Sequence, residues 1–309
     1  INVLVVEQST VGSGATGLSA GTIWCAGYGD YSDAEACVNQ CTTDFLEELQ
    51  AKGYDFEWVK SGALTIFFTE EEAAYYIKST QNYINRGYNM KYLKFPQSVE
   101  PNLDKSVTGA VFTPMSSHVQ PIQLAIAIGE AAENLGVKIL ENTSVLNIEK
   151  REPNQHILDT SVVKGTISNS KILTESNDYH YDVTLCRTDK LSPSSTNKIK
   201  KVKAKKVVLA AGTGCNFLLR QLFQGTKNNN DLPKYFWEKF TVVPIKGQVW
   251  VSEKAPYKTL KHIIFNGASH YLWRHANNIK TYYPKNLTHV DGERITFHSY
   301  GRQNKDGSI

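Results

Sequence analysis

Residues 3–7, VLVVE, are a short apolar run with β-branched residues that ends on an acid. Such a run predicts a buried β-strand, and an acid at the end of the strand is typical of nucleotide-binding α/β folds. There the carboxylate accepts hydrogen bonds from the hydroxyls of an adenosine ribose. In a complete fold of this kind the acid lies about 20 residues after a G-x-G-x-x-G turn. Here it is residue 7, so we expect the first strand and its glycine turn to lie upstream of Ile1.

Two glycine-rich segments strengthen this interpretation. The loop VGSGATGLSAG, residues 11–21, carries small residues that let a backbone approach a ligand, and hydroxyls suited to phosphate or flavin edges. The stretch VVLAAGTG, residues 207–214, predicts an apolar strand followed by a tight turn. A flexible surface loop and a turn without a ligand are the alternatives for each segment alone. The segments together are much more specific than any one of them.

The order of the predicted elements indicates two interleaved domains and an α/β fold. Helices are predicted, from apolar spacing and terminal Pro or Gly, at residues 33–52, 70–86 and 121–136. Strands are predicted at residues 61–69, 137–150, 181–188, 206–211, 242–253, 270–274 and 293–302. We expect a Rossmann-like nucleotide-binding domain interleaved with a substrate domain of the antiparallel-sheet α+β type. The first comprises residues 1–54 and 116–228, with a β excursion at 151–205, and the second comprises residues 55–115 and 229–309.

Composition argues against several classes of function. The net charge of +4 is small, and we interpret the one dense basic run, KIKKVKAKK at residues 198–206, as the solvated edge of a strand. A nucleic-acid partner is therefore not expected. No apolar run is long enough to span a bilayer. The five cysteines have the spacing neither of a zinc site nor of a disulfide framework, so no metal site is expected.

Several segments follow one another in a particular order: VLVVEQ, GATGLSAGTIW, SGALTIFFT, the helix and strands of residues 121–150, KAKKVVLAAGTG and VVPIKGQVWV. This order resembles the FAD-dependent oxidoreductase family of D-amino acid oxidase, glycine oxidase and the sarcosine and dimethylglycine dehydrogenases. The resemblance implies that the cofactor is FAD and that the Rossmann-like domain is an FAD-binding domain. The chain then looks like the middle of such a protein, and we expect either a fragment or a truncated relative that holds FAD poorly.

The resemblance also implies which residues contact FAD. We expect Glu7 to bind the adenosine ribose, with Gln8 beside it. Val145 is expected to contact the adenine through its backbone, and Ala211 and Gly212 to lie near the pyrophosphate or the ribityl chain. The residues expected to run along the flavin ring are Ala20, Gly21, Thr22, Ile23 and Trp24. Plain packing or turn chemistry is the alternative for each of them.

Cys25 lies in GTIWCAG, which resembles a GSTWHAAG-like segment of the dimethylglycine and sarcosine dehydrogenases, where the His carries the flavin covalently. A thiolate is also a nucleophile that can bond to a flavin methyl carbon. We expect Cys25 to lie beside the flavin. A covalent bond is the lesser hypothesis, because a buried free cysteine is usually inert packing.

The family's chemistry is oxidation of a carbon–nitrogen bond, in which a hydride passes from the α-carbon of an amine to the flavin and leaves an imine that hydrolyses. The resemblance implies a small-molecule amine or amino-acid substrate and, usually, a cation for its carboxylate. The candidates are Arg274, Arg302 and His270, together with a residue beyond Ile309. For each of the three named residues, a solvent-facing polar strand is the alternative.

Two other functions stay open. One is a catalytically silent scaffold or assembly subunit, which the Cys in place of His and the Lys/Asn-rich insertions support. The other is an FAD dehydrogenase that acts on a hydroxy acid or a glycerol phosphate. A mitochondrial location is expected only by resemblance to the dehydrogenases.

Overall fold

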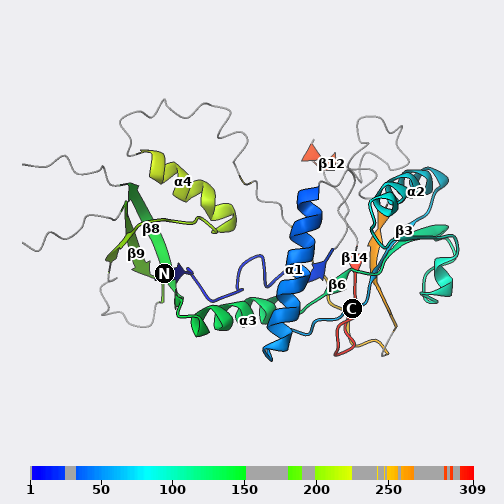
Figure 1. The fold of residues 1–309 in the computed structure, drawn as a ribbon, viewed down its shortest axis with the longest axis horizontal. Coiled ribbons are helices and arrows are strands. Elements are labelled where there is room, and N and C mark those ends of the chain that lie inside the picture. Colours follow the sequence, from blue (N-terminus) through cyan, green and yellow to red (C-terminus); the bar gives the residue numbers. More distant parts are fainter. Residues whose placement is uncertain are drawn as a thin grey trace, which may run out of the picture. The chain divides into compact units, whose positions relative to one another are not determined.

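A computed structural model gives the fold of the chain (Figure 1). It describes residues 2–24, 33–150, 180–189, 199–224, 242, 247, 249–256, 259–267, 289–290, 293–294 and 300–309. The chain divides into two compact units. Unit 1 comprises Ile1–Val11 and Leu135–Gly247, and unit 2 comprises Gly12–Asn134 and Gln248–Ile309. The two units therefore interleave along the sequence.

The first sheet of unit 1 is a parallel pair of strands. β1 (Leu4–Val6) lies beside β7 (Lys138–Leu140). The N–H of Glu7 donates to the carbonyl of Leu140 at 2.9 Å, so the acid lies where β1 ends. A parallel pair needs a long crossover connection, and here residues 12–134 connect the two strands.

The second sheet of unit 1 is antiparallel, in the order β10–β9–β8. Its strands are β8 (Thr143–Lys150), β9 (Tyr181–Arg187) and β10 (Lys200–Ala204). Helix α4 (Cys215–Gln224) contributes Leu218 to a buried cluster with Ile148, Val183 and Leu185. The lysine-rich β10 is an edge strand of this sheet in the described part of the chain, and charged edge strands resist pairing with another chain. The basic run therefore contains a strand of its own instead of leading into one at residues 206–211.

The predicted strand at residues 206–211 is wrong. No strand ladder includes these residues in the part of the chain that the structure describes. Val207 and Leu209 pack against the core of unit 1, whereas Val208 is 87% exposed, so the alternation of a strand is present. Alternation alone does not make a strand, because a strand also needs a hydrogen-bonded neighbour.

The larger sheet of unit 2 has the order β14–β11–β3–β5–β4 (Figure 1). Its strands are β3 (Ala63–Phe67), β4 (Lys91–Leu93), β5 (Gly109–Thr113), β11 (Ile263–Asn266) and β14 (Tyr300–Gly301). The central strand β3 is buried along its whole length. Every pairing is antiparallel except that of β3 with β11, which is parallel. The sheet is thus mixed, because β11 comes from a distant segment whose direction no hairpin sets.

The helices of unit 2 follow the signals in the sequence. They are α1 (Asp33–Ala51), α2 (Glu70–Asn85) and α3 (Pro121–Asn134). Thr69 caps α2, since its Oγ1 accepts the N–H of Glu72 at 3.2 Å. α1 and α3 contribute to one buried cluster, which consists of Leu46, Leu49, Phe56, Val119 and Ala127. The short elements η1 (Pro96–Ser98), β12 (His289–Val290) and β13 (Glu293–Arg294) complete the unit.

One more predicted strand differs from the structure. Within residues 242–253, none of the described residues belongs to a strand, and Trp250 and Val251 are exposed instead of paired. Of the strand predicted at 293–302, the structure describes residues 293–294 and 300–302, which contain β13 and β14. The strand predicted at 270–274 lies outside the described residues. The predicted domain boundaries stay a prediction, while the compact units place residues 12–54 and 116–134 in unit 2. No helix in the described part of the chain has the length and apolar character needed to cross a membrane.

Candidate functional site

The segment predicted to run along the flavin ring, residues 20–24, is held by a backbone ladder within unit 2. β2 (Thr22–Ile23) pairs antiparallel with β6 (Ser117–His118). The carbonyl of Gly21 accepts the N–H of Val119 at 2.9 Å. Gly21 has a φ of +68°, and a Cβ there would lie 2.2 Å from the carbonyl oxygen of Val119. Close approach of the two segments therefore requires glycine at this position.

Arg302 lies against the same segment. Its Nε donates to the carbonyl of Ala20 at 2.6 Å, and its Nη2 donates to the carbonyl of Val119 at 2.9 Å. Its Nη1 donates to Oδ1 of Asn304. Burial lowers the pKa of Arg302, and the carboxylate of Glu57 opposes this. Among the described residues, these contacts use the Nε–H and one N–H of each terminal nitrogen, so that one N–H of each has no partner there.

Trp24 anchors the other end of the flavin-ring segment in the core of unit 2. Its ring packs edge-on against Phe265 of β11, with the ring centroids 4.4 Å apart. Phe265 also stacks on Tyr300 of β14, with centroids 5.6 Å apart. The segment is therefore attached to the larger sheet through Trp24 at one end and to Arg302 through Ala20 at the other.

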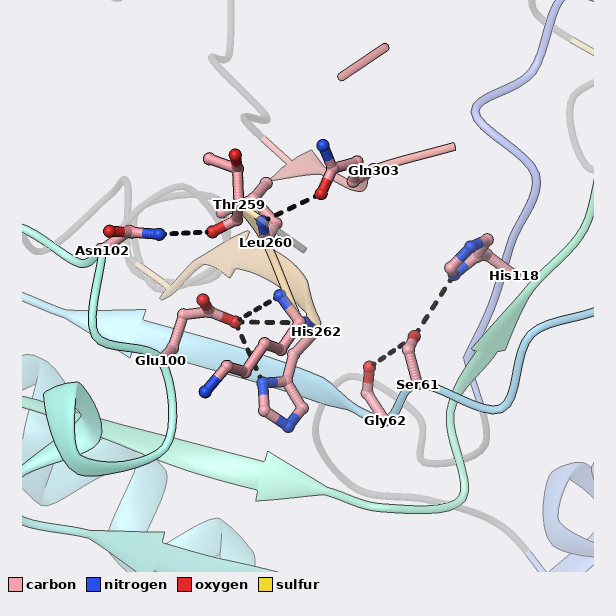
Figure 2. A network of polar contacts seen from close by, with 10 residues as sticks. Ser61, Gly62, Glu100, Asn102, His118, Thr259, Leu260, His262 and Gln303 are labelled. Carbon is pink, nitrogen blue, oxygen red and sulfur yellow. Dashed lines mark hydrogen bonds and ion pairs between the residues drawn. The ribbon is translucent and has the colours of Figure 1, made fainter. Parts of the chain in front are cut away.

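A buried histidine lies in β6, directly opposite the flavin-ring segment. His118 is 5% exposed, and its Nδ1 lies 3.2 Å from Oγ of Ser61 (Figure 2). Burial, with the positive charge of Arg302 as the second cause, lowers the pKa of His118 to about 4. The imidazole is therefore neutral at neutral pH. Sequence reasoning missed His118, because a lone histidine at a predicted strand carries no signal.

Glu7, the acid predicted to bind ribose, has one carboxylate oxygen held by the backbone of unit 1. Oε1 of Glu7 accepts the N–H of Ser9 at 2.9 Å, which orients the carboxylate. Among the described residues Oε2 has no hydrogen-bond partner. The remaining oxygen is available to accept a hydrogen bond from a ribose hydroxyl, so Glu7 fits the adenosine end of a dinucleotide.

A second glutamate, which sequence reasoning missed, holds the loop after β1. Glu141 follows β7, and its Oε1 accepts the N–H of Val11 at 2.6 Å. The carbonyl of Gln8 accepts a hydrogen bond from Oγ1 of Thr188 at 2.7 Å. The ends of the two parallel strands thus each carry a carboxylate that holds residues 8–11. The available signal was the position of Glu141 after the strand KIL, which matches the position of Glu7 after VLVV.

The other predicted cofactor residues of unit 1 lie at irregular backbone. The β8–β9 ladder shifts its register between Val145 and Asn147, and such a bulge leaves backbone groups outside the ladder. This suits the predicted contact of Val145 with adenine through its backbone. Ala211 precedes η2 (Gly212–Gly214), and Gly212 has a φ of +54°. Both are exposed, as a contact with a ligand requires.

The remaining predicted residues divide into two groups. Cys25, His270 and Arg274 lie outside the described residues, and their roles stay predictions. In the loop of residues 11–21, two glycines have a reason within the chain itself. A Cβ at Gly12 would lie 2.9 Å from Cβ of Ala125, and a Cβ at Gly17 would lie 2.1 Å from the carbonyl oxygen of Gly12. Gly12 is thus explained by packing on α3 and Gly17 by the close turn of the loop itself, so neither needs a ligand to explain it.

A second polar cluster fixes the start of β11 (Figure 2). Glu100 is completely buried, and its Oε2 accepts hydrogen bonds from Nδ1 of His262 at 3.0 Å and from the N–H groups of Lys261 and His262 at 2.9 and 3.1 Å. Among the described residues no donor reaches its Oε1. β11 carries Phe265, against which Trp24 packs. The connection of Glu100 to the flavin-ring segment is therefore indirect and runs through β11.

Comparison with known proteins identifies relatives of this chain. A family model described as FAD dependent oxidoreductase matches residues 1–305. Glycine oxidase from Bacillus cereus ATCC 14579 is 22% identical with a TM-score of 0.60, covering 86% of this chain and 61% of that one. Glycine oxidase from Geobacillus kaustophilus is 20% identical with a TM-score of 0.57, covering 86% and 59%. L-proline dehydrogenase from P. horikoshii is 15% identical with a TM-score of 0.57, covering 99% and 68%.

No curated protein matches the chain. It spans less than two thirds of the length of the two glycine oxidases. The family match covers the segments on which the resemblance in the sequence rests. The chain belongs to the FAD-dependent oxidoreductase family that includes D-amino acid oxidase, and the cofactor of this family is FAD.

Proposed function

We propose that the protein oxidises the carbon–nitrogen bond of an amino acid or of a secondary or tertiary amine. The observation that carries this proposal is the attachment of Arg302 to the flavin-ring segment, because a guanidinium held there could bind a carboxylate with the N–H groups that have no partner among the described residues. Glycine oxidase and L-proline dehydrogenase, which share the fold, are named for amino-acid substrates and support the same substrate class.

In this proposal FAD, when bound, supplies the hydride acceptor. The residues of the chain bind and orient. Glu7 accepts a ribose hydroxyl with Oε2, and Arg302 receives the carboxylate of the substrate while it holds Ala20. His118 is neutral, so Arg302 is the cation of this region that would attract the substrate. The positive charge of Arg302 favours a substrate that bears a carboxylate over a neutral amine.

The visible absorption spectrum of the full-length protein, purified from its own source, tests this proposal. Flavin bands that pass into the supernatant after acid precipitation would support a non-covalent FAD enzyme. Bands that remain with the pellet would support the covalent bond to Cys25, and Cys25→Ala should then release them. The absence of flavin bands would contradict the enzyme and favour the catalytically silent scaffold.

A further inference from the structure

His118 occupies a junction of three backbone segments in unit 2. On one side it pairs with Thr22 of the flavin-ring segment. On the other side its N–H donates to the carbonyl of Val59 at 3.0 Å, and its carbonyl accepts the N–H of Val59 at 2.9 Å. Any displacement of β6 is therefore transmitted directly to β2 through the ladder.

The side chain of His118 connects this junction to the larger sheet. Its Nδ1 lies 3.2 Å from Oγ of Ser61, and the Ser61 hydroxyl donates to the carbonyl of Gly62 at 3.1 Å. The same carbonyl accepts the N–H of Ile263, the first residue of β11, at 3.1 Å. A hydroxyl has a single proton, so when Ser61 donates it to Gly62 the imidazole must donate from Nδ1.

The surroundings of His118 disfavour its protonated form and therefore a role as a resting acid in the reaction. The imidazole is buried, and Arg302 is the charged group that acts on it. A protonated imidazole would place a second cation in the same buried region, which is unfavourable. A neutral imidazole with a directed hydrogen bond is instead suited to holding a backbone in place.

We propose that His118 is a positioning residue for the flavin: its Nδ1 contact with Ser61 fixes β6, and β6 fixes the flavin-ring segment of residues 20–24. This inference rests on the proposed function, because it concerns the segment expected to contact the flavin ring. It assigns a role to two residues, Ser61 and His118, that do not themselves touch substrate or cofactor.

The test compares two isosteres in the full-length flavin-loaded protein. His118→Asn retains a polar atom at the position of Nδ1, whereas His118→Gln retains one at the position of Nε2. We expect His118→Asn to keep the visible flavin spectrum and to hold FAD within about twofold of the wild type. His118→Gln should shift the flavin bands and weaken FAD binding about tenfold, since a buried hydrogen bond is lost. Ser61→Ala should also shift the flavin bands and weaken FAD binding. The double variant Ser61→Ala, His118→Gln should bind FAD about as weakly as His118→Gln alone, because both changes remove the same contact.

The control is His180→Gln, which changes an exposed histidine of unit 1 and should leave the flavin bands unchanged. If the Asn and Gln variants lower the melting temperature equally and leave the flavin spectrum and FAD affinity equal, the role is merely structural and the inference is overturned. If the wild-type protein itself holds no flavin, the proposed function fails first and this inference fails with it. Wild-type protein with flavin but no difference between the isosteres overturns the inference alone.

Discussion

Arg302 shows how one residue can serve both the fold and a substrate. Its guanidinium ties the carbonyl of Ala20 to that of Val119, and so it joins the start of the flavin-ring segment to the end of β6. Lysine is a point charge on a flexible stem and cannot reproduce this planar arrangement. Substitutions of Arg302 can therefore show separately how its positive charge and its planar hydrogen-bonding geometry each affect substrate binding.

Arg302→Lys keeps the charge, and we expect it to raise the KM for an amino-acid substrate about tenfold. Arg302→Met removes the charge as well and should raise KM about a hundredfold, because a hydrogen bond to a charged group is worth about 1.5–3 kcal/mol. Steady-state kinetics of the holoenzyme measures both. Arg220→Lys, on the exposed side of α4, is the matched control. An unchanged KM in Arg302→Met would show that the substrate carboxylate binds elsewhere.

His118 should make the stability of the fold depend on pH. Its pKa is about 4 in the folded chain and 6.5 in the unfolded one, so between these values the unfolded chain binds a proton that the folded chain excludes. The contribution, about 3 kcal/mol, is fully present above pH 6.5 and is lost as pH falls towards 4. Urea unfolding from about pH 7.5 down to about pH 4.5 should therefore show a steeper loss for the wild type than for His118→Asn. Equal pH profiles would contradict a buried neutral imidazole.

Among the secondary-structure elements, the parallel pair β1–β7 carries the acid predicted to bind the cofactor. Glu7 follows one strand and Glu141 the other, and each accepts a backbone N–H of the loop after β1. Hydrogen bonds that restrain a loop lower the entropic cost of binding a ligand to it.

Glu141→Gln keeps the shape of the side chain and removes its charge. We expect it to weaken FAD binding about fivefold, because a charge-assisted hydrogen bond to Val11 becomes a neutral one. Fluorescence titration of the apoprotein with FAD measures the change. Glu130→Gln, at an exposed position of α3, should leave the affinity unaltered. The same affinity in both variants would show that the loop does not need Glu141.

Glu100 holds the start of β11, and its loss should destabilise unit 2. Glu100→Ala leaves the partly buried N–H groups of Lys261 and His262 without their acceptor and should lower the free energy of unfolding by about 2 kcal/mol. Glu100→Gln retains an acceptor oxygen and should lower the free energy of unfolding by less than Glu100→Ala does. Chemical denaturation measures both changes. A stable Glu100→Ala variant would contradict this role.

Helices and buried strands of this chain were predictable, and hydrogen-bond partners were not. Thr69 before an acidic turn and Pro121 before an apolar helix are local signals, and α2 and α3 begin where these signals predict. Residues 206–211 have the alternation of a strand, but among the described residues no neighbouring strand is hydrogen-bonded to them. The alternation of apolar residues along the sequence cannot show whether such a partner strand exists. Glu141 and His118 matter through contacts with residues distant in the sequence, and spacing along the chain contains no information on such contacts.

At the scale of the whole molecule, the predicted FAD contacts are distributed over both units. Glu7, Gln8, Val145, Ala211 and Gly212 belong to unit 1, whereas Ala20, Gly21, Thr22, Ile23 and Trp24 belong to unit 2, as does Arg302, the candidate cation for the substrate. The family match includes residues of both units.

The most direct test of the central claim is anaerobic reduction of the flavin by candidate substrates. The full-length holoenzyme is mixed with amino acids and N-methylated amino acids, and separately with 2-hydroxy acids and glycerol phosphate, while the visible flavin bands are followed. Our account predicts that the bands bleach with members of the first group and persist with the second. Bleaching by a hydroxy acid or by glycerol phosphate alone would contradict oxidation of a carbon–nitrogen bond.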